Sequence, residues 1–225
     1  MTLPVMGQYA QQKGIDILSA CDWTHPLWFK EMRQQLEEMG EGIYSLKSQV
    51  LSTKSQVDKE KKTLFILSTE ISSIYSQGGK LRRIHNLVFA PNFETAEKIS
   101  KELVRRGCNL HSDGRPIIGL SSKNLLELIL SIDERCLLIP CHVWTPHFGI
   151  YGSASGFDSL DEAFGDLAKN IYGIETGLSS DPEMNWQIGE LINRSILSFS
   201  DAHSPAKMGR EATVFVSKDG MSNVK

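Results

Sequence analysis

The strongest constraint on the fold is an alternation of short apolar runs with segments of helical periodicity. The runs are almost continuously apolar, as strands buried on both faces are. They lie at residues 15–21, 64–69, 84–90, 137–142, 171–175 and 195–199. Helical patterns occupy residues 3–13, 26–39, 93–106, 121–132, 159–169 and 183–193. This order predicts an α/β domain whose parallel strands are covered by helices, as an open sheet or as a barrel.

Local signals predict where several helices begin and end. Gly14, Gly40 and Gly107 each follow a helical pattern, as glycines at helix C-termini do. Ser121 can cap the helix that follows it, and Asp181 with proline next to it opens residues 183–193.

Composition limits the class of protein. The 225 residues are 40% hydrophobic and 23% charged, which allows one sizeable core without disulfides. The net charge of −3 gives no overall basic field, so a nucleic acid would have to meet a local basic patch. The four cysteines form no C-x-x-C pair, and no signal peptide or apolar run of ~18 residues is present, so we expect a cytoplasmic protein without a membrane partner.

We expect one domain over residues 1–216 and a polar tail over 217–225. Residues 45–62 are polar and repeat the word KSQV, which favours a solvated insertion, although its lysines could meet a phosphate backbone. Met1 is followed at once by a helical pattern with no strand before it. This beginning suggests a piece of a longer protein or a shortened variant.

Residues able to bind a metal gather at one end of the predicted strands. Because the carboxyl ends of parallel strands share one edge, these side chains are expected to converge there. Mixed His, Asp and Glu donors suit zinc, manganese or iron, and clustered metals hydrolyse phosphate esters. The candidates are Asp22, His25, Glu70, His85, His142, Glu175, Asp201 and His203.

Several segments resemble the PHP (polymerase and histidinol phosphatase) family of metal-dependent phosphoesterases in order and spacing. They read ACDWTHP, STEIS, RRIHNLVFAP, IPCHVWTP and SDAHSP. Within the family, DGRPIIGL, GSASGFDS and IETGLSSDPEMNW are similar to the endonuclease Q branch. The resemblance covers nearly all of residues 7–216.

The resemblance implies a distorted (β/α)7 barrel with up to three divalent ions, which could be zinc, manganese or magnesium. It implies that Glu70 bridges two ions and that His85 and His142 complete one site with it. It also implies that Asp201 holds the neighbouring ion and that His203 and His25 hold the third. Asp22 is then a ligand or orients one, and the catalytic residues are Glu70, Asp201 and His203.

The endonuclease Q branch implies cleavage of DNA on the 5′ side of deaminated bases and abasic sites. Damaged DNA is then the expected partner, and no nucleotide cofactor is expected. The family also has a first strand that ends in His-x-His, and endonuclease Q has a downstream cysteine-rich zinc module; this chain shows neither. The barrel is therefore expected to lack its first strand. Two alternatives stay open: a phosphatase of a small phosphorylated metabolite, and a truncated metal-binding barrel without activity.

A second set of residues could contact a DNA substrate. Basic side chains could bind phosphates, and aromatic side chains in the glycine-containing loop after His142 could stack on a base. The serines before residue 182 could bind an anion at a helix N-terminus. Each has a structural alternative, such as a solvated turn, loop packing or helix capping. The candidates are Arg82, Arg83, Arg115, Trp144, His147, Ser179, Ser180 and Arg210.

Overall fold

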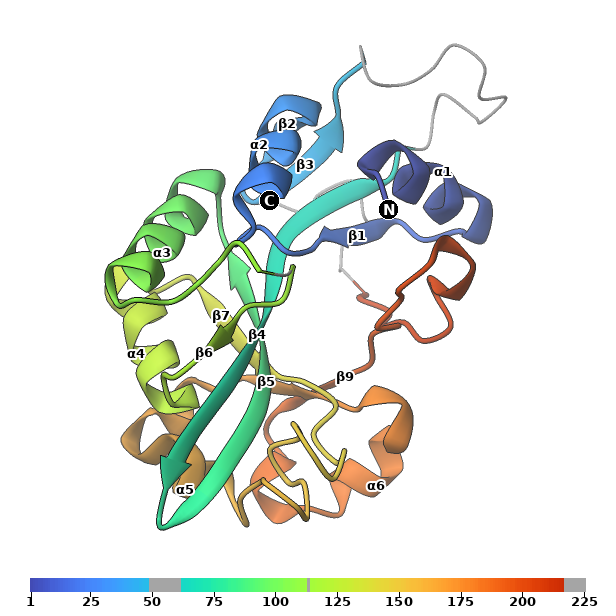
Figure 1. The fold of residues 1–225 in the computed structure, drawn as a ribbon. Helices are drawn as coiled ribbons and strands as arrows, with labels where there is room; N and C mark the ends of the chain where they lie inside the picture. Colours follow the sequence, from blue (N-terminus) through green and yellow to red (C-terminus); the bar gives the residue numbers. More distant parts are fainter. Residues whose placement is uncertain (49–61, 113, 217–225) are drawn as a thin grey trace.

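The computed structural model describes residues 1–48, 62–112 and 114–216 (Figure 1). Most of the predicted insertion at 45–62 and all of the predicted tail at 217–225 lie outside these residues. Within them, none of the helices combines the length and apolarity that crossing a membrane requires.

A seven-stranded mixed sheet forms the centre of the fold. Its main path runs β2-β3-β4-β5-β7, and β1 and β6 both pair with β4. Only β1 and β6 run parallel to β4, whereas the pairs along the main path are antiparallel. The strands are β1 (Ile17–Ala20), β2 (Leu36–Gly40), β3 (Ile43–Leu46), β4 (Leu64–Gln77), β5 (Lys80–Ala90), β6 (Ile117–Ile118) and β7 (Leu137–Pro140).

A second, parallel sheet pairs β8 (Gly173–Glu175) with β9 (Ser195–Leu197). The mixed α/β class is confirmed. The expectation of mainly parallel strands is wrong, and the strands of the described residues form these two sheets without closing into a barrel.

The long hairpin β4–β5 explains the difference. Residues 64–69 and 84–90 were expected as two separate short strands, but both extend toward each other and pair antiparallel from Leu67–Ala90 to Gln77–Lys80. Gly78 and Gly79 close the hairpin, both with positive φ (61° and 72°), which a tight two-residue turn requires.

The helices flank the sheet. They are α1 (Leu3–Lys13), α2 (Pro26–Gln35), α3 (Phe93–Arg105), α4 (Ser122–Ile132), α5 (Leu160–Phe164) and α6 (Pro182–Trp186). Short 3₁₀ turns follow at η1 (Gly165–Asn170), η2 (Gly177–Ser179), η3 (Gly189–Leu191) and η4 (Pro205–Lys207). Gly14 ends α1 in the left-handed conformation, and the Ser121 hydroxyl accepts the Asn124 N–H, as predicted. The helix expected at 26–39 stops at Gln35, since residues 36–40 pair with β3 instead.

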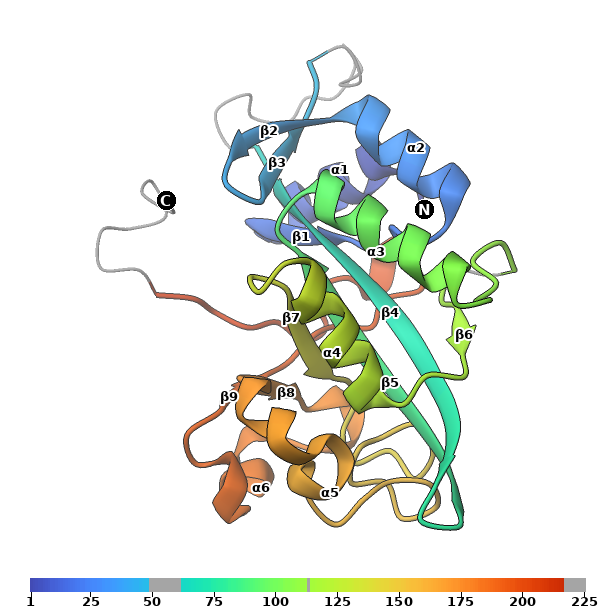
Figure 2. The ribbon, with the colours of Figure 1, turned by 90° about the vertical axis from the view of Figure 1, so that its left-hand side faces the viewer.

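The two faces of the hairpin differ in what covers them. Helices α3 and α4 lie against one face (Figure 2). The Asn86 amide on β5 donates to Ser122 on α4 and lies opposite Ile71 in the register, so even-numbered residues of β5 face the helices. Ile71, Ile84 and Val88 are fully buried there. Because side chains alternate along a strand, the odd-numbered residues of β5 point to the opposite face.

Candidate metal centre

The register of the hairpin brings Glu70 and His85 together. Glu70 pairs with Leu87 and Ser72 pairs with His85, so Glu70 and His85 are diagonal neighbours on the face opposite α3 and α4. Diagonal neighbours lie within reach of long side chains. The His85 Nδ1 atom lies 2.7 Å from Glu70 Oε1, and the His85 side chain is only 6% exposed.

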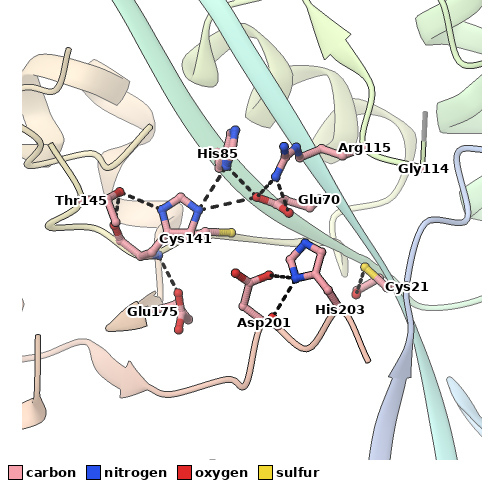
Figure 3. A network of polar contacts seen from close by, with 12 residues as sticks. Cys21, Glu70, His85, Gly114, Arg115, Cys141, Thr145, Glu175, Asp201 and His203 are labelled. Carbon is pink, nitrogen blue, oxygen red and sulfur yellow. Dashed lines mark hydrogen bonds and ion pairs between the residues drawn. The ribbon is translucent and has the colours of Figure 1, made fainter. Parts of the chain in front are cut away.

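His142 reaches the same point from the end of β7. Strand β7 pairs with β5 on the side away from β4, and the Cys141 N–H donates to the His85 carbonyl at 3.0 Å. His142 follows directly, and its Nε2 lies 3.6 Å from Glu70 Oε1 and 3.1 Å from His85 Nδ1 (Figure 3). Three neighbouring strands therefore supply one side chain each.

Glu70, His85 and His142 form a group that could hold a metal ion, and we call it the metal trio. One donor atom from each residue lies within 4.8 Å of the others. Across the described ranges, no other set of three or more His, Cys, Asp or Glu donors is this close together. An aspartate or glutamate with two imidazoles is a donor set that suits zinc, manganese or iron.

The charges in the trio favour an ionised Glu70. Burial alone would raise the pKa of Glu70, but hydrogen bonds from His142 and His85 and the charges of His85 and Arg115 hold it well below its usual range. Burial lowers the pKa of His85, whereas the Glu70 carboxylate outweighs burial and raises the pKa of His142. The Arg115 Nη1 lies 3.4 Å from Glu70 Oε2. The site thus offers a carboxylate and a buried imidazole, in the protonation states that metal ligation needs.

Thr145 determines which nitrogen of His142 faces the other two residues of the trio. The Thr145 hydroxyl donates to the His142 carbonyl at 2.9 Å and lies 3.0 Å from His142 Nδ1. A hydroxyl has one proton, so its oxygen accepts from Nδ1–H. Nε2 is therefore the nitrogen that faces Glu70 and His85, and it could bind a cation there once it gives up the proton that the Glu70 carboxylate stabilises.

Phe148 covers His85. Its ring stacks on the imidazole at 4.3 Å between centroids and 30° between planes. The His85 N–H donates to the Phe148 carbonyl at 2.9 Å. This contact excludes water from one side of the trio.

Unusual backbone conformations gather around this site. In the described part of the chain, four residues other than glycine have positive φ: Asp22 (67°), His142 (32°), Phe148 (69°) and Asp201 (42°). Such strain costs free energy and clusters at functional sites. One of the four belongs to the trio, one stacks on it, and the other two were predicted as metal-binding residues.

The other predicted ligands lie outside the trio. Asp201 and His203 follow β9 and are exposed, and the His203 Nδ1 is 3.0 Å from the Asp201 carbonyl (Figure 3). His25 is half-buried at the start of α2. The Asp22 carboxylate packs so closely on Gly114 that a Cβ there would lie 2.8 Å from its Oδ2. Burial raises the pKa of the Cys141 thiol, and so do the charges of Glu70, Glu175, Cys21 and Asp201.

The structure separates the predicted phosphate-binding arginines. Arg82 is buried, with its guanidinium on the Phe157 ring and its N–H groups donated to Gly156 and Glu162, so it holds a loop and is not free to meet a phosphate. Arg83 is half-buried and shares the face of His85. Arg115 points at Glu70. Arg210 is exposed and donates to the carbonyls of Ser200 and Asp201, which holds the Asp201 segment.

The predicted substrate loop is partly committed to packing. Trp144 donates its N–H to Asn185 at 2.9 Å and lies 5.0 Å from the Tyr151 ring. The Ser180 hydroxyl donates to the Thr176 carbonyl. His147 and Ser179 are exposed.

Thr145 and the role of Glu175 were not foreseen. Glu175 was noted only as a ligand-type residue at a strand end, yet its carboxylate accepts backbone N–H groups. Thr145 stands three residues after His142, and this short spacing is the one local signal that could have indicated it.

Comparison with known proteins gives this geometry a context. No family profile matches the chain. It is 31% identical over 212 residues to the uncharacterized protein YqxK of Bacillus subtilis (92% of this chain, 49% of YqxK). It is 24% identical over 139 residues to the uncharacterized protein MJ0043 of Methanocaldococcus jannaschii (62% of this chain, 13% of MJ0043). The chain spans about half the length of YqxK and a smaller share of MJ0043.

Two solved structures resemble the fold. The lesion-specific endonuclease PfuEndoQ from Pyrococcus furiosus matches with a TM-score of 0.75 and 26% identity, over 93% of this chain and 46% of that one. An endonuclease Q in complex with a 27-mer duplex carrying an abasic lesion at its active site matches with a TM-score of 0.74 and 27% identity, over 91% and 45%. The chain thus has a mixed α/β fold similar to endonuclease Q, with a candidate metal-binding trio.

Proposed function

We propose that this chain is a metal-dependent endonuclease of the endonuclease Q type, which cuts DNA on the 5′ side of a deaminated base or an abasic site during repair. The observation that carries the proposal is the metal trio, in which three neighbouring strands direct donor atoms at one point. The likeness to endonuclease Q structures, one with an abasic duplex at its active site, supports DNA as the substrate.

The residues of the trio fit a divalent cation. The pKa of Glu70 is low, His142 directs Nε2 at Glu70, and His85 is buried beneath Phe148. When bound, zinc, manganese or magnesium polarises a phosphate and lowers the pKa of a water. Glu70, His85 and His142 would hold one such ion. We propose Asp201, His203, His25 and Asp22 for further ions, because the backbones of Asp22 and Asp201 are strained like that of His142.

Side chains around the trio would balance the charge of Glu70 and contact the substrate. The Glu70 carboxylate would bind the cation. Asp201 and His203 are proposed as catalytic residues, because both are exposed and could meet the substrate. Arg115 neutralises Glu70 and can turn to a phosphate, because its side chain is 41% exposed. The other residues proposed to contact DNA are Arg83, Arg210, Trp144, His147, Ser179 and Ser180.

A nicking assay tests the proposal. The purified chain is offered a 5′-labelled duplex with one abasic site, hypoxanthine or uracil, in Mn²⁺, Mg²⁺ or Zn²⁺, beside an undamaged duplex. We expect a nick 5′ to the lesion, at least about 100-fold slower in Glu70→Gln and His142→Ala. His111→Ala, which removes an exposed histidine outside the trio, serves as the control and keeps the rate.

Other outcomes would point elsewhere. Turnover of p-nitrophenyl phosphate alone would favour a phosphatase. Metal binding without turnover of either substrate would favour a non-catalytic metal protein. Nicking that survives in Glu70→Gln would remove the trio from the mechanism.

A further inference from the structure

Glu175 is a buried carboxylate that the proposed chemistry does not use. It ends β8 and is 5% exposed. Its two oxygens accept three backbone N–H groups. Oε2 accepts from His142 at 2.5 Å (Figure 3), and Oε1 accepts from Gly177 at 2.8 Å and from Phe199 at 3.3 Å. Each oxygen of a carboxylate accepts up to two hydrogen bonds, so these donors use much of its capacity.

The donors belong to separate segments of the site. His142 starts the loop after β7, and Phe199 lies in the segment that runs from β9 to Asp201. Glu175 therefore connects the loop that carries a trio residue with the segment that carries a proposed further ligand. Burial raises the pKa of Glu175, whereas the N–H groups of His142, Gly177 and Phe199 lower it, as hydrogen bonds that stabilise a carboxylate do.

The backbone around Glu175 adds a second constraint on His142. The Val143 N–H donates to the Glu175 carbonyl at 3.1 Å. Gly177 lies so close that a Cβ on it would be 2.5 Å from His142 Cβ and 2.8 Å from its Cα. His142 is thus held from both sides at φ 32°, a value that residues with a Cβ seldom adopt.

We propose that Glu175 is a positioning residue: its carboxylate, through the N–H groups of His142 and Phe199, fixes the backbone that presents His142 to Glu70 and His85 and aligns the Asp201 segment. The role as a support for metal binding rests on the proposed function. The anchoring of the two segments is a property of the metal-free chain.

The chemistry of the anchor predicts which replacement fails. Glutamine keeps the size of the side chain but replaces one oxygen with an NH₂ group, which would face a backbone N–H. Two donors then oppose each other, and either His142 or the Gly177 and Phe199 pair loses its acceptor. Aspartate keeps both oxygens but is one methylene too short to reach both segments.

Two measurements test the proposal on the full chain. The first is titration with Co²⁺ alone, followed by visible absorption. We expect binding about 10- to 100-fold weaker in Glu175→Gln, with altered absorption bands. The second is amide hydrogen exchange without metal, where we expect faster exchange at His142 and Phe199.

Glu190→Gln is the matched control. Glu190 is also a carboxylate that accepts a backbone N–H, from Leu160 at 3.1 Å, together with the Tyr151 hydroxyl, and none of its hydrogen bonds in the described residues goes to the trio. We expect Co²⁺ affinity within about twofold of the unmodified chain. If Glu175→Gln yields no folded protein, Glu175→Asp takes its place in both measurements.

The outcomes separate the two proposals. Unchanged Co²⁺ affinity and unchanged exchange in the Glu175 variant would overturn the positioning role. The same loss of affinity in Glu190→Gln would also overturn it, because general destabilisation would then explain the result. If the unmodified chain binds no Co²⁺, the proposed function fails, and the exchange of His142 and Phe199 alone decides whether Glu175 anchors them.

Discussion

Thr145 determines which nitrogen of His142 can bind a metal ion. Its hydroxyl donates to the His142 carbonyl and accepts from Nδ1–H, so Nε2 is the nitrogen that can bind a cation beside Glu70. Groups that fix the tautomer of a ligating histidine contribute to metal affinity without touching the metal. The side chain is therefore a test of the site that leaves every proposed ligand in place.

Replacing Thr145 with valine, which has the same shape but no hydroxyl, is expected to weaken Co²⁺ binding about 10-fold or more. The measurement is a metal titration at constant pH. Thr213→Val is the control, because the Thr213 hydroxyl also accepts an N–H and donates to a carbonyl, both of Ser198. Equal losses in the two variants would contradict a specific role for Thr145.

At the scale of elements, Asp133 ties helix α3 to helix α4. It is the C-terminal cap residue of α4, and its Oδ2 accepts the Thr95 hydroxyl in the first turn of α3 at 2.9 Å. Hydrogen bonds from Arg135 hold the pKa of this carboxyl well below its usual range. The stabilisation is therefore present above the pKa of the unfolded chain, about 3.9, and is lost as the pH falls through and below it.

Asp133→Asn should lower the free energy of unfolding by about 1 kcal/mol at pH 7, or Tm by about 2–4 °C. Denaturant unfolding of both proteins between pH 7 and pH 3 checks the sign, because the difference should shrink toward pH 3. Asp166→Asn, which removes an exposed pair with Lys123, should change stability by less than about 0.5 kcal/mol. A difference that grows on acidification would contradict the assignment.

The elements also show what could be predicted from sequence. The predictions for α1, α3 and α4 are confirmed closely, because their apolar faces, caps and terminal glycines are local signals. The antiparallel pairing of β4 with β5 was missed. The polar stretch around Ser72 and Ser73 made β4 look as if it ended early, although the pair Gly78-Gly79 is typical of a hairpin turn. Strand β2 was read as the end of a helix, since residues 36–39 have no helix-ending residue before Gly40.

The same limit applies to the site. Glu70, His85 and His142 were foreseen because each is a ligand-type residue in or after an apolar run, and the structure brings them together. The hydrogen bonds from Arg82 to Gly156 and Glu162 were not foreseen, because those partners lie more than 70 residues further along the chain. Contacts of this kind depend on the assembled fold and leave no mark in local sequence.

At the scale of the whole molecule, a cation that binds only the folded chain must stabilise it. At a free metal concentration 100 times the dissociation constant the gain is about 2.7 kcal/mol. For a domain of this size that raises Tm by about 5–10 °C. Thermal unfolding with Mn²⁺, Co²⁺ or Zn²⁺ measures it, and EDTA should reverse it.

Glu70→Gln should abolish most of this shift, since it removes the charged donor of the trio. An equal rise in Tm for Glu70→Gln and the unmodified chain would place the stabilising ion elsewhere in the molecule.

The tight turn at Gly78-Gly79 has a consequence for the order of folding. Glu70 and His85 are 15 residues apart along one hairpin, whereas His142 stands 57 residues beyond His85. Closing a short loop sacrifices less chain entropy, and local contacts form sooner than distant ones. Glu70 and His85 can therefore come together before the rest of the chain has folded. His142 joins them only when β7 pairs with β5. Tight binding of a cation would therefore indicate that β4, β5 and β7 have all paired.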